Sequence, residues 1–203
     1  MNIQKSSVTD IDDNKYETVI IGKQEWMAQN LCVEHYRNGD IIPNITDVNE
    51  WGDLRTGAWW HYENNSDIGN IYGKLYNWYA INDPRGLAPE GWHIPSVDEW
   101  NKLFNYLGDD AECKLKSDKL WEKSKHKTTN ESGFSALPGG AYMSNGFYVI
   151  GKHACFWSST ECGSGGAWYR VLTHDNARVI PFDYVNKERG VSCRCIKNEL
   201  NKR

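Results

Sequence analysis

One stretch of the chain places its apolar residues with the period of an α-helix. Four apolar side chains occur at positions i, i+3, i+4 and i+7, namely Trp100, Leu103, Phe104 and Leu107. This spacing puts them on one face of a helix. The pattern therefore predicts a helix over residues 97–107 that packs on a core.

Both ends of this predicted helix carry the residues that usually begin and end one. Ser96 and Glu99 have the spacing of a capping box, in which each side chain satisfies a free backbone amide. Pro95 disfavours helical geometry in the residue before it. Gly108 follows the last apolar position and can adopt the left-handed conformation that ends a helix.

Weaker patterns cover the rest of the first 130 residues. Alternation around a Gly-Lys turn indicates a β-hairpin over residues 16–27. Residues 36–67 are rich in Asn, Asp and Gly, which is typical of long loops. Regularly spaced aromatic residues predict a second helix over residues 72–82, and the Lys-rich residues 109–130 are expected to lie on the surface.

The last third of the chain has a different pattern. After residue 140, short apolar runs are separated by Gly, Asn or Asp, as in an antiparallel meander. Two short helices followed by such a sheet predict an α+β fold, with the sheet mostly after residue 140. No internal repeat or linker is visible, so we expect a single domain over residues 8–198.

Composition narrows the possible partners. The 203 residues carry a net charge of −4, which does not indicate a nucleic-acid partner. No run approaches the roughly 18 apolar residues of a membrane helix, and the first seven residues show no signal-peptide core. Ten Trp, 11 Tyr and five Phe predict an aromatic core.

Six cysteines are compatible with an oxidising compartment, although 15 pairings are possible. Cys193 and Cys195 are excluded as a pair, because two residues on one face of a strand are roughly 7 Å apart. If the protein is exported, we expect some of the others to be bridged.

Several segments resemble, in order, the Fibrobacter succinogenes major paralogous domain family (FISUMP). The resemblance covers residues 8–198 and is carried by residues 16–31 (YETVIIGKQEWMAQNL), 72–80 (YGKLYNWYA), 86–96 (GLAPEGWHIPS), 133–140 (GFSALPGG), 156–161 (FWSSTE) and 191–197 (VSCRCIK). This resemblance implies a bacterial surface or secreted protein, often a lipoprotein. A more distant similarity to the formylglycine-generating enzyme group implies a C-type lectin-like fold.

Two function classes follow from these observations. The first, which we favour, is a non-catalytic surface module that recognises a glycan or a protein. The second is a metal-dependent oxidase related to the formylglycine group, which would need reactive thiols and a metal. The cysteines do not fall in that group's motifs, the six histidines are dispersed, and calcium-lectin and nucleotide-binding motifs are absent from the sequence. We therefore expect no cofactor and no metal, while the oligomeric state stays open.

The expected ligand surface combines aromatic rings with charged groups in the second half of the lectin-like fold. Its candidate residues are Tyr169, Arg178, His174, Asp175 and Glu161, together with Trp59 and Trp60.

Strand alternation gives this surface a direction. We expect Tyr169 and Val171 to face solvent, and Trp168 and Leu172 to face inward because they are the bulkier pair. Arg170 would then lie on the inner side and require a buried acceptor or carboxylate.

Overall fold

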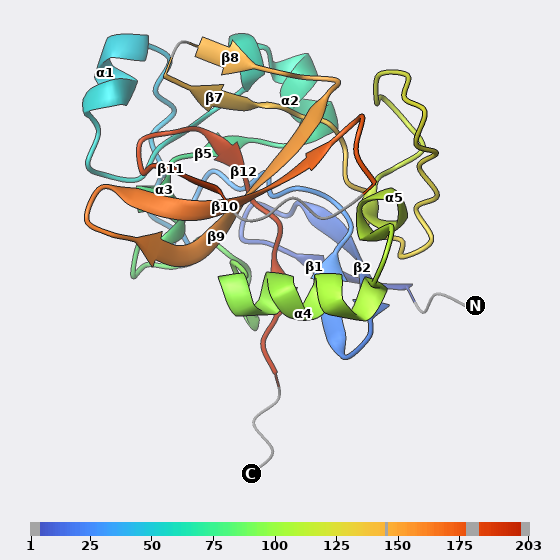
Figure 1. The fold of residues 1–203 in the computed structure, drawn as a ribbon. Coiled ribbons are helices and arrows are strands. Elements are labelled where there is room, and N and C mark those ends of the chain that lie inside the picture. Colours follow the sequence, from blue (N-terminus) through green and yellow to red (C-terminus); the bar gives the residue numbers. More distant parts are fainter. Residues whose placement is uncertain (1–4, 145, 178–182, 200–203) are drawn as a thin grey trace.

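The computed structural model describes residues 5–144, 146–177 and 183–199 of the chain. Its helices are α1 (Val48–Asp53), α2 (Ser66–Tyr72), α3 (Trp78–Ile81), α4 (Val97–Leu107) and α5 (Ala111–Leu115), with a 3-10 turn at Tyr62–Asn64. Its strands are β1 (Lys5–Thr9), β2 (Lys15–Ile21), β3 (Gln24–Met27), β4 (Trp59–Trp60), β5 (Leu75–Tyr76), β6 (Trp92–His93), β7 (Ala141–Met143), β8 (Gly146–Tyr148), β9 (His153–Cys162), β10 (Gly166–Thr173), β11 (Asp183–Asn186), β12 (Val191–Ser192) and β13 (Ile196–Lys197). Figure 1 shows α4 along the lower side of the molecule, below β9 and β10, with α1 and α2 at the opposite side.

Within the described residues the strands form two larger sheets and a small hairpin. The five-stranded sheet has the order β1-β2-β3-β13-β6, and the six-stranded sheet has the order β11-β10-β9-β12-β5-β4. Pairing is antiparallel between the named strands except for one parallel contact between β12 and β9. The fold is therefore α+β with mainly antiparallel sheets, as the sequence predicted.

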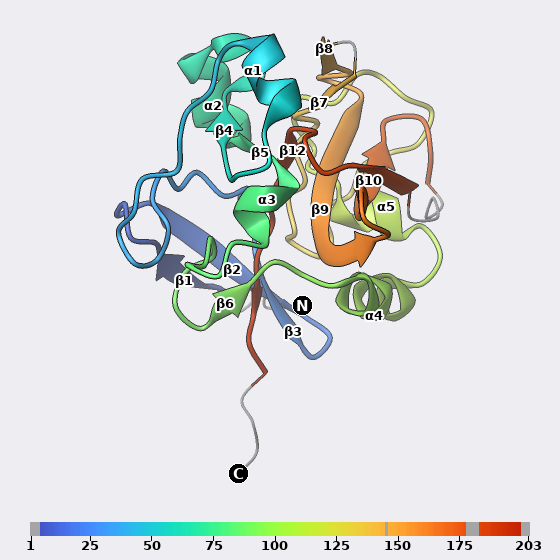
Figure 2. The ribbon, with the colours of Figure 1, turned by 90° about the vertical axis from the view of Figure 1, so that its left-hand side faces the viewer.

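The two larger sheets are joined near the C-terminus. The chain leaves the six-stranded sheet after β12 and enters the five-stranded sheet at β13. Figure 2 shows this dark-red segment descending through the middle of the molecule. Residues 193–195 are the link, and all three of them are buried.

The helix predicted over residues 97–107 is confirmed as α4. Ser96 accepts a hydrogen bond from the Glu99 amide, and the Glu99 side chain accepts one from the Ser96 amide at 2.8 Å, so the capping box is formed. Trp100 and Phe104, on the inner face of α4, are buried. The Trp100 ring lies 4.9 Å from that of Trp26, which ties α4 to the five-stranded sheet.

The hairpin predicted over residues 16–27 is also confirmed, as β2 and β3. The helix predicted over residues 72–82 is wrong. Leu75–Tyr76 pair with β12 on one side and with β4 on the other. Within the predicted range, only Tyr72, at the end of α2, and Trp78–Ile81 of α3 are helical. Aromatic residues suit strands as well as helices. Residues 75 and 76 form a strand rather than a helix because β12 and β4, which are distant in the sequence, provide hydrogen-bond partners for their backbone groups.

Two further expectations need correction. The sheets are not mostly after residue 140, because β1, β2, β3 and β6 supply most of the five-stranded sheet. Residues 109–130 are not wholly a surface excursion, because Glu112 and Leu115 of α5 are fully buried. The core is aromatic as expected: Trp26, Trp51, Trp60, Trp100 and Trp157 have no exposed side-chain surface.

Candidate functional site

Three of the aromatic residues expected on a ligand surface are buried. Tyr169 is 8% exposed, Trp59 5% and Trp60 0%. The Trp60 ring stacks on Trp51 at 4.9 Å, inside an aromatic cluster. These side chains fill the core, and the expectation that Tyr169 faces solvent is wrong.

The reason lies in an irregularity of β10. The pairing of β10 with β9 shifts register between Ala167 and Tyr169, which is the signature of a β-bulge. Both Tyr169 and Arg170 are buried, whereas Trp168 is only half-buried, so the expectation that Trp168 faces inward is also wrong. Leu172 is buried as predicted.

Arg170 lies inside the molecule, as predicted, and it has a carboxylate nearby. Its guanidinium lies 4.4 Å from the centre of the Phe104 ring. Burial lowers the pKa of Arg170 to about 10, and the negative charge of Glu112 opposes this shift. Glu112 also faces Lys116 at 4.0 Å, and both of these side chains are fully buried.

The other expected site residues are not gathered together. Glu161, near the end of β9, forms an ion pair with Lys187. His174 and Asp175 directly follow the last residue of β10, and His174 Nδ1 lies 3.8 Å from Asp175 Oδ1. Arg178 lies outside the described residues.

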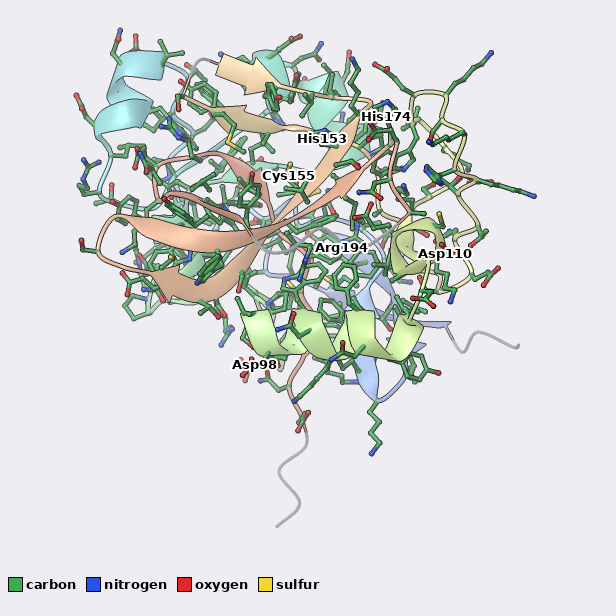
Figure 3. The ribbon with its side chains drawn as sticks, in the orientation of Figure 1. Asp98, Asp110, His153, Cys155, His174 and Arg194 are labelled. Carbon is green, nitrogen blue, oxygen red and sulfur yellow. The ribbon has the colours of Figure 1, made fainter. Side chains whose placement is uncertain are left out.

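Figure 3 shows His153 and His174 at the same end of the β9–β10 hairpin. Burial, and next the charge of His174, lower the pKa of His153. In the part of the chain that the structure describes, no three His, Cys, Asp or Glu side chains are grouped so as to hold a metal ion.

All six cysteines are unpaired, and four of them are buried. Burial raises the pKa of Cys155 to about 12 and that of Cys193 well above its usual value. Thiols of this kind stay protonated and unreactive near neutral pH. The structure contains no disulfide bond among the six cysteines, so it forms none of the bridges that we expected for an exported protein.

A cavity of about 450 Å³ is lined by none of the residues that the sequence suggested for a ligand surface. We refer to it as the amide cavity, because side-chain amides recur along its wall. Its lining comes from residues 14–16, 28–30, 70–73 and 117–119, with Cys32, Asn130, Ser135, Leu137 and Arg194. These segments belong to β2, the chain after β3, the end of α2 and the chain after α5.

One glycine allows two walls of the amide cavity to meet. Gly73 ends α2 with a φ of 81°, a left-handed conformation that favours glycine. A Cβ atom at this position would lie 2.8 Å from Cβ of Asn30. The end of α2 therefore lies directly against the chain after β3, and Asn30 Nδ2 donates to the Tyr72 carbonyl at 2.8 Å.

Arg194 forms the inner end of the amide cavity. The residue is 1% exposed, and Figure 3 places it between α4 and the strands β9 and β10. Its Nε and Nη2 donate to Asn30 Oδ1 at 3.1 and 2.8 Å. Its Nη1 donates to the carbonyls of Met27 and Phe134 at 3.1 and 2.5 Å. Burial lowers the pKa of Arg194 to about 9.

Hydrogen bonds fix much of the remaining wall. Asn14 Nδ2 and the Tyr16 hydroxyl donate to Asp10 Oδ2 at 3.0 and 2.6 Å. Asn130 Nδ2 donates to Ser135 Oγ at 2.9 Å, and the Ser135 amide donates to Asn130 Oδ1 at 2.9 Å. These bonds hold the wall in place within the protein itself, and a wall fixed in this way would lower the entropy cost of binding a ligand.

The mouth of the amide cavity has a different character. Lys15, Gln29, Asn70, Asp118 and Lys119 are all exposed and line the cavity. They add amide and charged groups that can bond to a ligand without a large desolvation cost. The mouth also includes the apolar side chain of Ile71, which is 54% exposed.

The Fibrobacter succinogenes major domain family matches residues 19–197 of this chain. The chain belongs to this family. Searches among curated proteins and among solved structures gave no match. The family membership confirms the resemblance seen in the sequence, and it covers most segments that line the amide cavity in this family member.

Sequence reasoning missed the amide cavity because its residues come from separate parts of the chain. One signal was present: Arg194 is a charged residue between two cysteines in an otherwise apolar strand-like run. Among the described residues, no helix has the length and apolar character needed to cross a membrane.

Proposed function

We propose that this chain is a non-catalytic bacterial surface or secreted module with a C-type lectin-like fold, and that it binds a glycan in the amide cavity. A protein ligand is the other member of the same class. The observation that carries the proposal is the cavity itself, which is concave, lined by side-chain amides and hydroxyls, and closed at its inner end by a buried guanidinium. The aromatic residues first considered for this role are in the core instead.

The chemistry of the wall suits a saccharide. Sugars present hydroxyl groups that both donate and accept hydrogen bonds, and amides do the same. A volume of about 450 Å³ lies within the range of small-ligand sites and accommodates a few sugar rings. Half-buried Tyr72 and exposed Ile71 add apolar surface for the less polar face of a ring.

The thiols favour a binding module over the oxidase alternative. Cys155, Cys193 and Cys195 are buried, and burial raises the pKa of each of them. An oxidase of the formylglycine type would use thiolates on a metal, and a thiolate forms readily only where a positive field lowers its pKa.

The test is a binding screen against oligosaccharides and surface proteins, followed by calorimetry on the hits. Asn70→Trp should place a large side chain at the mouth and reduce affinity at least about tenfold, because the ligand loses its place in the cavity. Asn101→Trp is the matched control, since Asn101 is also an exposed helical asparagine but lies on α4. Binding that survives Asn70→Trp unchanged would exclude the amide cavity as the site.

A further inference from the structure

Arg194 has one more hydrogen-bond donor than the protein uses. A guanidinium carries five N–H groups. Four hydrogen bonds account for Nε, both N–H groups of Nη1 and one N–H of Nη2. The second N–H of Nη2 has no acceptor among the described residues. A buried donor without a partner is uncommon and costly in a folded protein.

The charge of Arg194 is also unbalanced within the protein. Every acceptor that it contacts is neutral: an amide oxygen and two backbone carbonyls. Its other close neighbours are the rings of Phe134 and Phe156, at 4.4 and 5.4 Å. A buried cation normally has an anionic partner, because the desolvation cost is otherwise uncompensated.

The side chains that line the amide cavity carry a net positive charge, although the protein as a whole is acidic. Lys15, Lys119 and Arg194 line the cavity, against one carboxylate from Asp118. The full chain, by contrast, has a net charge of −4. Positive charge is therefore concentrated at this cavity, with two cations at the mouth and one at the inner end.

Resting on the glycan-binding function proposed above, we propose that the ligand is an acidic saccharide whose carboxylate group binds at the Arg194 end of the amide cavity. The carboxylate accepts the remaining Nη2 N–H and supplies the negative charge that the protein does not. The sugar hydroxyls bond to the wall amides, and the lysines at the mouth attract the anion as it approaches. A carboxylate suits this position because a charge-assisted hydrogen bond from a guanidinium is shorter and stronger than a neutral one.

The deciding measurement compares two ligands that differ only in charge. A trimer of galacturonic acid and its fully methyl-esterified form are titrated into the wild-type protein by calorimetry. The free acid should bind at least about tenfold more tightly, since hydrogen bonds to charged groups are stronger than neutral ones. Equal affinities, no binding of the acid, or a preference for a sulfated oligosaccharide of the same length would each overturn the inference.

The Asn70→Trp variant distinguishes a failure of the acidic specificity from a failure of the proposed glycan-binding function. If the acid and the ester bind equally and Asn70→Trp abolishes both, the cavity still binds a glycan but the acidic specificity is wrong. If binding of the acid is lost in this variant and the ester binds weakly, both proposals stand.

Variants at the cations test the electrostatic part. Lys119→Gln should weaken binding of the acid about threefold to tenfold and leave the ester unaffected, with Lys23→Gln as an exposed control outside the cavity. Arg194→Gln should remove the preference for the acid. Because Arg194 is buried, folding of this variant is checked by circular dichroism, and the acid–ester comparison on wild type decides if it does not fold.

Discussion

Arg170 and Arg194 are two buried guanidinium groups with different electrostatic surroundings. Both are at most 2% exposed, and each lies 4.4 Å from the centre of a phenylalanine ring. Arg170 faces the buried carboxylate of Glu112, which opposes the effect of burial on its pKa. Arg194 contacts only neutral acceptors, and its pKa is lowered further, to about 9 compared with about 10.

From this difference we propose that Arg170 is a structural cation and that Arg194 is available to a ligand. Arg170 lies on β10 against α5, where the protein supplies the counter-charge itself. Arg194 lies in the link between the two larger sheets and lines the amide cavity. Burial of a cation does not by itself indicate a binding site. Our proposal of a site at Arg194 rests on the lack of a carboxylate among its contacts together with an adjacent cavity.

The largest effect is expected from removing the counter-charge on the Arg170 side. Glu112→Gln keeps the shape of the side chain but leaves Arg170 and Lys116 without their buried carboxylate. Breaking a buried ion pair in this way costs about 3–5 kcal/mol of the free energy of unfolding. Chemical denaturation would measure the loss.

Two further variants are needed to interpret the stability loss of Glu112→Gln. Glu131→Gln removes an exposed carboxylate and should change stability by less than about 0.5 kcal/mol. Arg194→Met should destabilise less than Glu112→Gln, because it removes an unbalanced buried cation along with its hydrogen bonds. If Arg194→Met is the more destabilising of the two variants, our contrast between a balanced Arg170 and an unbalanced Arg194 is wrong.

A smaller effect tests the strand geometry that buries Arg170. Because Tyr169 is buried beside Trp157, Tyr169→Ala should cost about 3 kcal/mol, as other large aromatic truncations in a core do. Trp168→Ala should cost less, since Trp168 is half-buried. Thermal melts of both variants would show the order, and the reverse order would mean that β10 faces the other way.

Elements that depend on residues close together in the chain were predicted correctly. Features that depend on contacts between residues far apart in the chain could not be predicted from the sequence. Helix α4 is defined by residues within one stretch, from the cap at Ser96 to the glycine at Gly108, so its position followed directly. The bulge in β10 depends on pairing with β9, and Arg194 binds groups from residues 27, 30 and 134. A simple rule of alternation could therefore not place Tyr169, and no motif could assemble the amide cavity.

The smallest effect concerns an ion pair that is balanced within the protein but partly exposed. His93 Nε2 lies 2.8 Å from Glu99 Oε1 at the start of α4, and the His93 side chain is 38% exposed. The hydrogen bond to Glu99 raises the pKa of His93, against the effect of burial. For Glu99, burial raises the pKa, but hydrogen bonds from His93 and Ser96 outweigh it and lower the pKa to about 2.

These shifts define a pH window for the His93–Glu99 pair. The contribution of His93 is complete below its unfolded pKa of 6.5 and is lost as the pH rises through its higher folded value. The contribution of Glu99 is complete above its unfolded pKa of 4.5 and is lost as the pH falls toward about 2. The pair therefore stabilises the fold most between pH 4.5 and 6.5.

His93→Gln should reduce the free energy of unfolding inside this window by less than about 1 kcal/mol, because solvent screens a partly exposed pair. Urea denaturation of wild type and variant at about pH 5.5 and about pH 8.5 would measure this, with the larger difference expected at the lower pH. His126→Gln, which lies outside the pair, serves as the control. A difference that grows toward alkaline pH would mean that Glu99 does not stabilise the charged form of His93. The contrast between balanced and unbalanced charges would then rest on Arg170 and Arg194 alone.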